Sequence, residues 1–62
     1  MKTSYWLTMT LGTQRVTTFE GFRLGPARLW RDAVNRQNDG VKTVLVACTP
    51  HPDGSVKEEV VA

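Results

Sequence analysis

Cysteine and histidine are scarce in this sequence, which has one of each, Cys48 and His51, among 62 residues. A single cysteine cannot form an intramolecular disulfide, the usual support of small secreted domains, so we expect a reducing, cytoplasmic location. Zinc needs three or four protein ligands, and this pair supplies only two. The five glycines match neither a phosphate-binding loop nor a dinucleotide fingerprint. The sequence therefore predicts no metal site and no cofactor.

Long apolar runs are also absent. No stretch approaches the roughly 20 apolar residues that a membrane-spanning helix needs. The apolar segment near the N-terminus is interrupted by Thr8 and Thr10, and no small-residue cleavage site follows it before Arg15. We therefore expect neither a signal peptide nor contact with a membrane.

The small size of the chain argues against an enzyme. Sixty-two residues make one domain, residues 1–62, which buries only about 60% of the surface that its unfolded form exposes and leaves little room for a cleft. Cys48 and His51 would need a pocket and a third, orienting group to act as a catalytic pair. The simpler interpretation is a buried strand cysteine and an exposed turn histidine. We predict no catalytic residue.

The first half of the chain predicts a β-hairpin. Apolar and polar residues alternate over 5–11, and 14–19 is rich in β-branched residues, so both segments are typical of strands. Gly12 and Thr13 between them supply a tight turn. With a two-residue loop, the expected pairs are Leu11 with Gln14, Met9 with Val16, and Trp6 with Phe19.

A helix is predicted from Pro26 to Asn38, with Gly40 as its C-terminal cap. The segment is amphipathic. Its apolar side, expected to face the sheet, holds Leu29, Trp30, Ala33 and Val34. Its outer side is expected to be basic and holds Arg28, Arg31 and Arg36.

The C-terminal third predicts two more strands. Residues 41–49 form the most apolar run and are expected at the centre of a sheet, while the charges of 55–61 suit an edge strand. The predicted fold is a single ββαββ domain of the α+β class, with a four-stranded sheet and one amphipathic helix on one face. Two strand orders stay open. The order 2-1-3-4 is favoured because the third strand is the more apolar, and a β-grasp-like order 2-1-4-3 comes second.

Positive charge gathers in the first part of the chain. Residues 1–36 hold six of the eight Lys and Arg residues but only two of the six acidic ones. The planar guanidinium fork binds carboxylates and phosphates well. We predict a partner-binding site of five arginines: Arg15, Arg23, Arg28, Arg31 and Arg36. An acidic protein surface is the favoured partner, because Asp32 within the helix would repel the phosphates of a nucleic acid.

One face of the predicted sheet has no cover within the chain, because a single helix covers only the other face. Trp6 and Phe19 lie on this uncovered face, together with either Val44 and Val46 or Leu45 and Ala47, depending on register. Uncovered apolar patches on small proteins mark interaction surfaces. We therefore predict a hydrophobic interface at Trp6 and Phe19 and a homodimer formed through it.

These features together predict a non-enzymatic binding protein that acts by protein–protein contact. In size and style the chain resembles accessory proteins of phages and mobile elements, including inhibitors of host defence complexes. That resemblance implies a protein that inhibits or modulates a host complex. The alternative is a small DNA- or RNA-binding module that uses the arginine-rich face of its helix, with Asn35, Gln37 and Asn38 available to contact bases.

Overall fold

The computed structural model describes residues 2–37 and 42–62. Its elements follow in the order β1 (Ser4–Leu11), β2 (Gln14–Phe19), α1 (Leu24–Gln37), β3 (Lys42–Pro50) and β4 (Val56–Val61). This order confirms the predicted ββαββ arrangement and the α+β class. The expected helix end at Asn38 and the cap at Gly40 lie outside the described residues.

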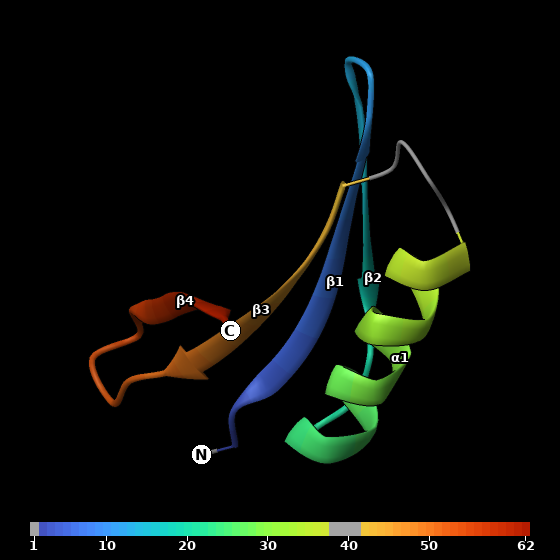
Figure 1. Ribbon diagram of the computed structural model, residues 1–62. Coiled ribbons are helices and arrows are strands. Elements are labelled where there is room, and N and C mark those ends of the chain that lie inside the picture. Colours follow the sequence, from blue (N-terminus) through green and yellow to red (C-terminus); the bar gives the residue numbers. More distant parts are fainter. Residues whose placement is uncertain (1, 38–41) are drawn as a thin grey trace.

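The four strands form one antiparallel sheet in the order β2-β1-β3-β4. This result confirms the favoured 2-1-3-4 order over the β-grasp-like alternative. The physical reason lies in the composition of the last two strands: β3 carries the fully buried Leu45, whereas β4 carries three consecutive charged residues and lies at the edge. In Figure 1, α1 lies on one side of the sheet and the β1–β2 hairpin projects beyond it.

The hairpin register is the predicted one. Leu11 pairs with Gln14, Met9 with Val16, and Trp6 with Phe19. The two-residue turn includes Gly12 at a φ of 62°, a left-handed conformation that glycine adopts without strain. The turn therefore fixes which side chains of β1 and β2 share each face of the sheet.

The hydrophobic core is small and lies between the sheet and α1. Leu7 of β1 and Leu45 of β3 are direct cross-strand partners, both are 0% exposed, and Ala27 of α1 packs against them. Tyr5, Val34 and Val61 pack around this cluster and are partly buried. Two leucines thus provide the only large, fully buried side chains among the described residues.

The prediction of which helix face meets the sheet was wrong for its two largest residues. Leu29 is 71% exposed and Trp30 is 54% exposed. Val34 packs against the core as predicted, and Ala27, which was not on the predicted face, is the buried helix residue. A small side chain such as Ala27 lets the helix axis approach the two core leucines closely. The helix also begins at Leu24, two residues before the expected start. Its rotation leaves a tryptophan and a leucine facing solvent.

Candidate functional site

The five predicted arginines do not form one patch. Arg15 lies on β2, where it pairs with Thr10 and shares the Trp6 side of the sheet. Arg28, Arg31 and Arg36 lie on α1, which covers the opposite side of the sheet. The predicted site is therefore divided between two surfaces by the sheet itself.

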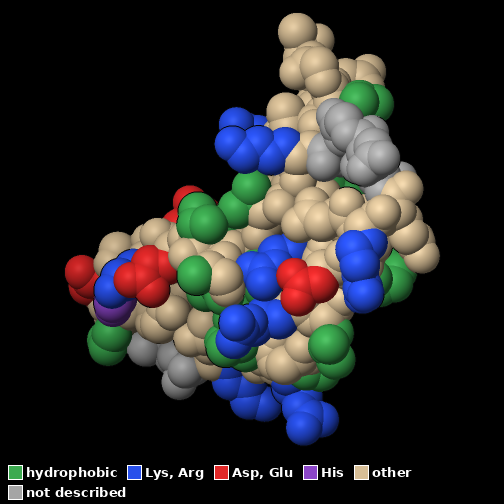
Figure 2. Space-filling view, in the orientation of Figure 1, with side chains coloured by type: hydrophobic (Ala, Val, Ile, Leu, Met, Phe, Trp, Pro, Cys, Tyr) green, Lys and Arg blue, Asp and Glu red, His purple; other side chains and the backbone are tan. Residues whose placement is uncertain are grey.

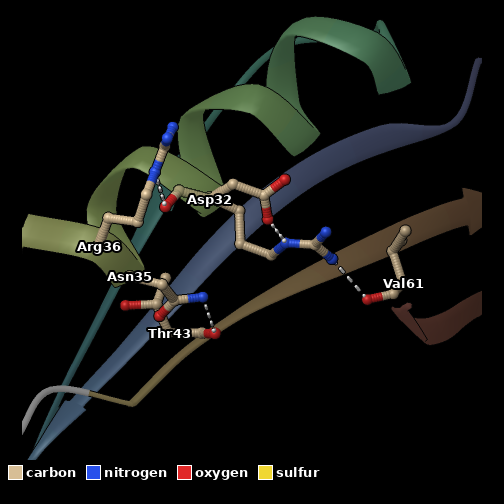
Figure 3. Close-up of polar contacts among 6 residues, drawn as sticks. Asp32, Asn35, Arg36, Thr43 and Val61 are labelled. Atoms are coloured by element: carbon tan, nitrogen blue, oxygen red, sulfur yellow. Dashed lines mark hydrogen bonds and ion pairs between the residues drawn. The ribbon is translucent and has the colours of Figure 1, made fainter.

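Arg31 is not part of the outer helix surface, contrary to the prediction. Its side chain is only 13% exposed. The guanidinium donates one hydrogen bond of 3.1 Å from Nε to Oδ1 of Asp32 and one of 2.9 Å from Nη1 to the carbonyl of Val61. Figure 3 shows these contacts, with Asp32 on the helix and Val61 at the end of β4. Arg31 therefore links α1 to the edge strand β4 by a hydrogen bond.

The outer surface of α1 combines exposed apolar and basic side chains. We call Arg28, Leu29, Trp30 and Arg36 the helix ridge. Arg36 donates a hydrogen bond of 3.4 Å from Nε to the main-chain carbonyl of Asp32, and within residues 2–37 and 42–62 neither Arg28 nor Arg36 has a carboxylate partner. Figure 2 shows basic side chains interspersed with acidic ones on this side of the molecule. The helix ridge thus offers cations and apolar area together.

The opposite side of the sheet, which we call the open face, carries a continuous apolar row. Strand pairing places Phe19, Trp6, Val46 and Val60 next to one another across β2, β1, β3 and β4. The register resolves the earlier alternative, because Val44 and Val46 share this face and Leu45 points into the core. Phe19 and Val60 are exposed. The predicted interface residues Trp6 and Phe19 therefore belong to a larger row.

The aromatic end of this row is ordered by specific contacts. The rings of Trp6 and Phe19 have their centroids 5.0 Å apart at 58°, and Phe19 meets Phe22 edge-on at 5.3 Å. The indole Nε1 of Trp6 donates a hydrogen bond of 3.0 Å to Oγ of Ser4, which satisfies its polar atom within the chain. A partner can therefore cover the rings without leaving the indole N–H unpaired.

Sequence reasoning missed Phe22, which lies between the second predicted strand and the predicted helix and was assigned no role. The pairing of β1 with the chain after β2 continues through hydrogen bonds of 2.8 Å from Glu20 N to Tyr5 O and 2.9 Å from Tyr5 N to Gly21 O. Gly21 has a φ of 100°, a conformation suited to glycine. The signal was the spacing Phe19-Glu20-Gly21-Phe22, in which a flexible glycine separates two aromatic residues.

The open face is hollowed. The hollow has a volume of about 710 Å³, and its lining includes Trp6, Val44 and Val46. Arg15 and Glu58 also line it. By strand pairing, Arg15 belongs to the end near the β1–β2 turn and Glu58 to the end near Ser4. The hollow therefore has an apolar middle, a cation at one end and a carboxylate at the other.

Cys48 is only partly buried, in contrast to the predicted buried cysteine. It lies on the open face with Sγ 4.0 Å from Oε1 of Glu58. Burial and the Glu58 carboxylate raise the pKa of the Cys48 thiol, which keeps it protonated and weakly nucleophilic. His51 is exposed in the turn after β3, where its main chain bonds Ser55 and Gly54. Across the described ranges, no group of three or more His, Cys, Asp or Glu side chains is placed to hold a metal ion.

The thiol and the imidazole should both be dispensable for folding. We expect Cys48→Ala to lower the free energy of unfolding by about 1 kcal/mol and His51→Ala to change it by less than about 0.5 kcal/mol, as measured by urea denaturation. The difference follows from the partial burial of Cys48 and the exposure of His51. A larger loss in His51→Ala than in Cys48→Ala would contradict this assignment.

Comparisons of the chain with protein-family models, curated proteins and solved structures find no match. Within residues 2–37 and 42–62, α1 is the one helix, and its described part is too short and too polar to cross a membrane.

Proposed function

We propose that the protein is a non-enzymatic binding protein that acts by protein–protein contact through the helix ridge. The exposure of Leu29 and Trp30 carries this proposal, because the fold packs the other side of α1 on the core and leaves these two side chains in solvent. Tryptophan and arginine are the residues most enriched among those that dominate interface energies. The helix ridge carries one tryptophan and two arginines on the same helix.

The charges of the helix ridge support a partner with an acidic surface. Arg28 and Arg36 have no carboxylate partner in the described part of the chain, and Arg23, just before α1, has none either. A guanidinium can make two parallel hydrogen bonds to one carboxylate, which gives both affinity and orientation. Inhibition or modulation of a host complex, expected from the size and style of the chain, is one way in which such a contact would act.

The nucleic-acid alternative has less support from the described contacts. Arg31 is engaged with Val61 and is not available to a base, and Nδ2 of Asn35 uses one of its two N–H groups on the carbonyl of Thr43 at 3.5 Å. Asp32 stays half exposed next to the helix ridge. Its carboxylate would lie close to phosphates bound there, at an electrostatic penalty.

The homodimer expected from the sequence is compatible with this proposal. The open face and the helix ridge lie on opposite sides of the sheet, so a second copy on the open face leaves the ridge accessible. Each dimer would then present two helix ridges, and a partner with two matching sites would be held more tightly by avidity.

The test compares the wild type with Trp30→Ser and with the double variant Arg28→Glu/Arg36→Glu. Each is used to capture proteins from a nuclease-treated lysate of the source, and the captured partner is then purified for affinity measurements. We expect Trp30→Ser to weaken binding by about 30-fold, the effect of losing about 2 kcal/mol at a dominant interface residue. The double variant should weaken it at least as much.

Leu11→Ser is the matched control, because Leu11 is equally exposed but lies at the tip of the β1–β2 hairpin, away from α1. It should bind like the wild type. Unchanged binding by Trp30→Ser would overturn the proposal. Capture of nucleic acid from a parallel lysate without nuclease, with a log–log salt slope of about 2.7 or steeper, as three phosphate contacts give, would favour the alternative function.

A further inference from the structure

The open face has charges at two diagonally opposite corners. Arg15 lies on β2 opposite Thr10, and Glu58 lies on β4 opposite Cys48, which in turn faces Ser4. The two corners are three strand spacings apart across the sheet, about 14 Å, and six residues apart along the strands, about 20 Å. Arg15 has no ion-pair partner among the described residues, and Glu58 contacts only the thiol of Cys48. Both charges are therefore available to a second molecule.

The chain exposes more surface than a compact monomer of its mass. Its accessible area is 4641 Å², whereas a folded monomer of this size exposes about 4,000 Å², so the excess is about 600 Å². A stable protein interface buries about 800 Å² on each partner. The excess is therefore of the size that one interface would cover.

The small core gives a thermodynamic reason for such an interface. Leu7 and Leu45 are the only large side chains that the described part of the chain buries completely. The open face, in contrast, keeps Phe19, Phe22 and Val60 in solvent. Covering this row would add apolar burial that the isolated chain lacks, and it would couple folding to association.

We propose that the open face is the interface of a two-fold symmetric homodimer in which Arg15 of each copy pairs with Glu58 of the other. A two-fold axis that lies between the sheets and runs perpendicular to the line from Arg15 to Glu58 maps each corner onto the opposite one, so one contact generates the second. The strands of the two sheets then cross closer to a right angle than to parallel, which is one of the two usual packings of sheet on sheet. Trp6 and Val46 come near the axis.

Charge complementarity is what favours a second copy over other occupants. The open face is complementary to itself, because its cationic corner and its anionic corner exchange places under the two-fold rotation. Single-stranded nucleic acid could stack on Trp6 and Phe19, but Glu58 would repel its phosphates. A different protein on the open face would need an acidic group opposite Arg15 and a basic group opposite Glu58, whereas a second copy of the chain supplies both.

Charge reversals test this geometry, with sedimentation equilibrium giving the dissociation constant and circular dichroism giving the folded fraction. The wild type should be a dimer. Arg15→Glu and Glu58→Arg alone should each weaken the dimer by at least about tenfold, because each places two like-charged pairs at the interface. An equimolar mixture of the two variants should dimerise like the wild type, since both pairs in the mixed dimer are opposite in sign. The double variant in one chain should do so as well.

Two controls separate this dimer from the other proposal and from general charge effects. Lys57→Glu reverses a charge on the neighbouring residue of β4, whose partner Thr49 shares the helix side of the sheet with Ala47, and it should leave the dimer unchanged. Trp30→Ser should also dimerise normally, so loss of partner binding at the helix ridge and loss of dimerisation at the open face are distinct results.

A monomeric wild type would overturn the proposal. Single variants that dimerise like the wild type would overturn it too, and so would a mixture that stays as weak as its components. If the single variants unfold because folding requires association, the mixture should regain the folded signal. A mixture that stays unfolded would then contradict the proposed pairing.

Discussion

Leu45→Ala should lower the free energy of unfolding by about 2–5 kcal/mol, the usual effect of removing a buried leucine side chain. Leu45 is fully buried between Leu7 on β1 and Val61 on β4, and Ala27 of α1 packs on the same cluster. A domain of this length has a total stability of only about 3–5 kcal/mol. The variant should therefore be largely unfolded at 25 °C, which urea titrations followed by circular dichroism would measure.

Leu11→Ala is the matched control for this substitution. The same atoms are removed, but Leu11 is exposed at the end of β1, so the free energy of unfolding should change by less than about 0.5 kcal/mol. Equal losses in the two variants would show that the cluster around Leu45 is not the core of the fold. A greater loss in Leu11→Ala would place the core in the hairpin instead.

Arg31→Met should lower the free energy of unfolding by about 1.5–3 kcal/mol, the range for hydrogen bonds that involve a charged group. Methionine retains much of the apolar stem of Arg31, so the loss reports mainly on the bonds from the guanidinium to Val61 and Asp32. Hydrogen exchange should also become faster at the amides of β4, because Arg31 fastens this edge strand to α1. Urea denaturation and amide exchange measure the two effects.

Arg28→Met makes the same substitution one turn earlier on α1, at an exposed side chain with no ion pair among the described residues. It should change the free energy of unfolding by less than about 0.5 kcal/mol. If both variants lose the same stability, the contact between Arg31 and Val61 contributes nothing measurable. If the prediction holds, reversing all three helix arginines together would damage the fold, and only Arg28 and Arg36 are suitable for binding tests.

The two proposed surfaces have different origins in the sequence. The open face follows from alternation, because a strand with Trp6 on one side and Leu7 on the other must expose one of them once a single helix covers the sheet. The helix ridge depends on how α1 is rotated about its axis. Local sequence leaves that rotation open, since Leu29 and Trp30 would suit a core as well as Ala27 and Val34 do.

The sequence by itself determined the elements that depend on neighbouring residues. Alternation and β-branched residues defined the strands, and the turn at Gly12 fixed the hairpin register. The apolar third strand and the charged fourth strand gave their order in the sheet. All of these follow from local conformation and from the alternation of side chains along a strand. A one-residue slip in strand pairing would move every side chain of that strand to the opposite face of the sheet.

Only the tertiary structure decided which helix residues face the sheet and what the long side chains reach. At about 100° per residue the predicted apolar face of α1 extends from Leu29 to Val34, and packing against Leu7 and Leu45 selected its Val34 edge together with Ala27, the smallest side chain at the contact. Arg31 lies on the selected side, and its flexible stem lets the guanidinium reach a carbonyl of β4, thirty residues away in sequence. Contacts of this range depend on the assembled sheet, so no local sequence pattern could predict them.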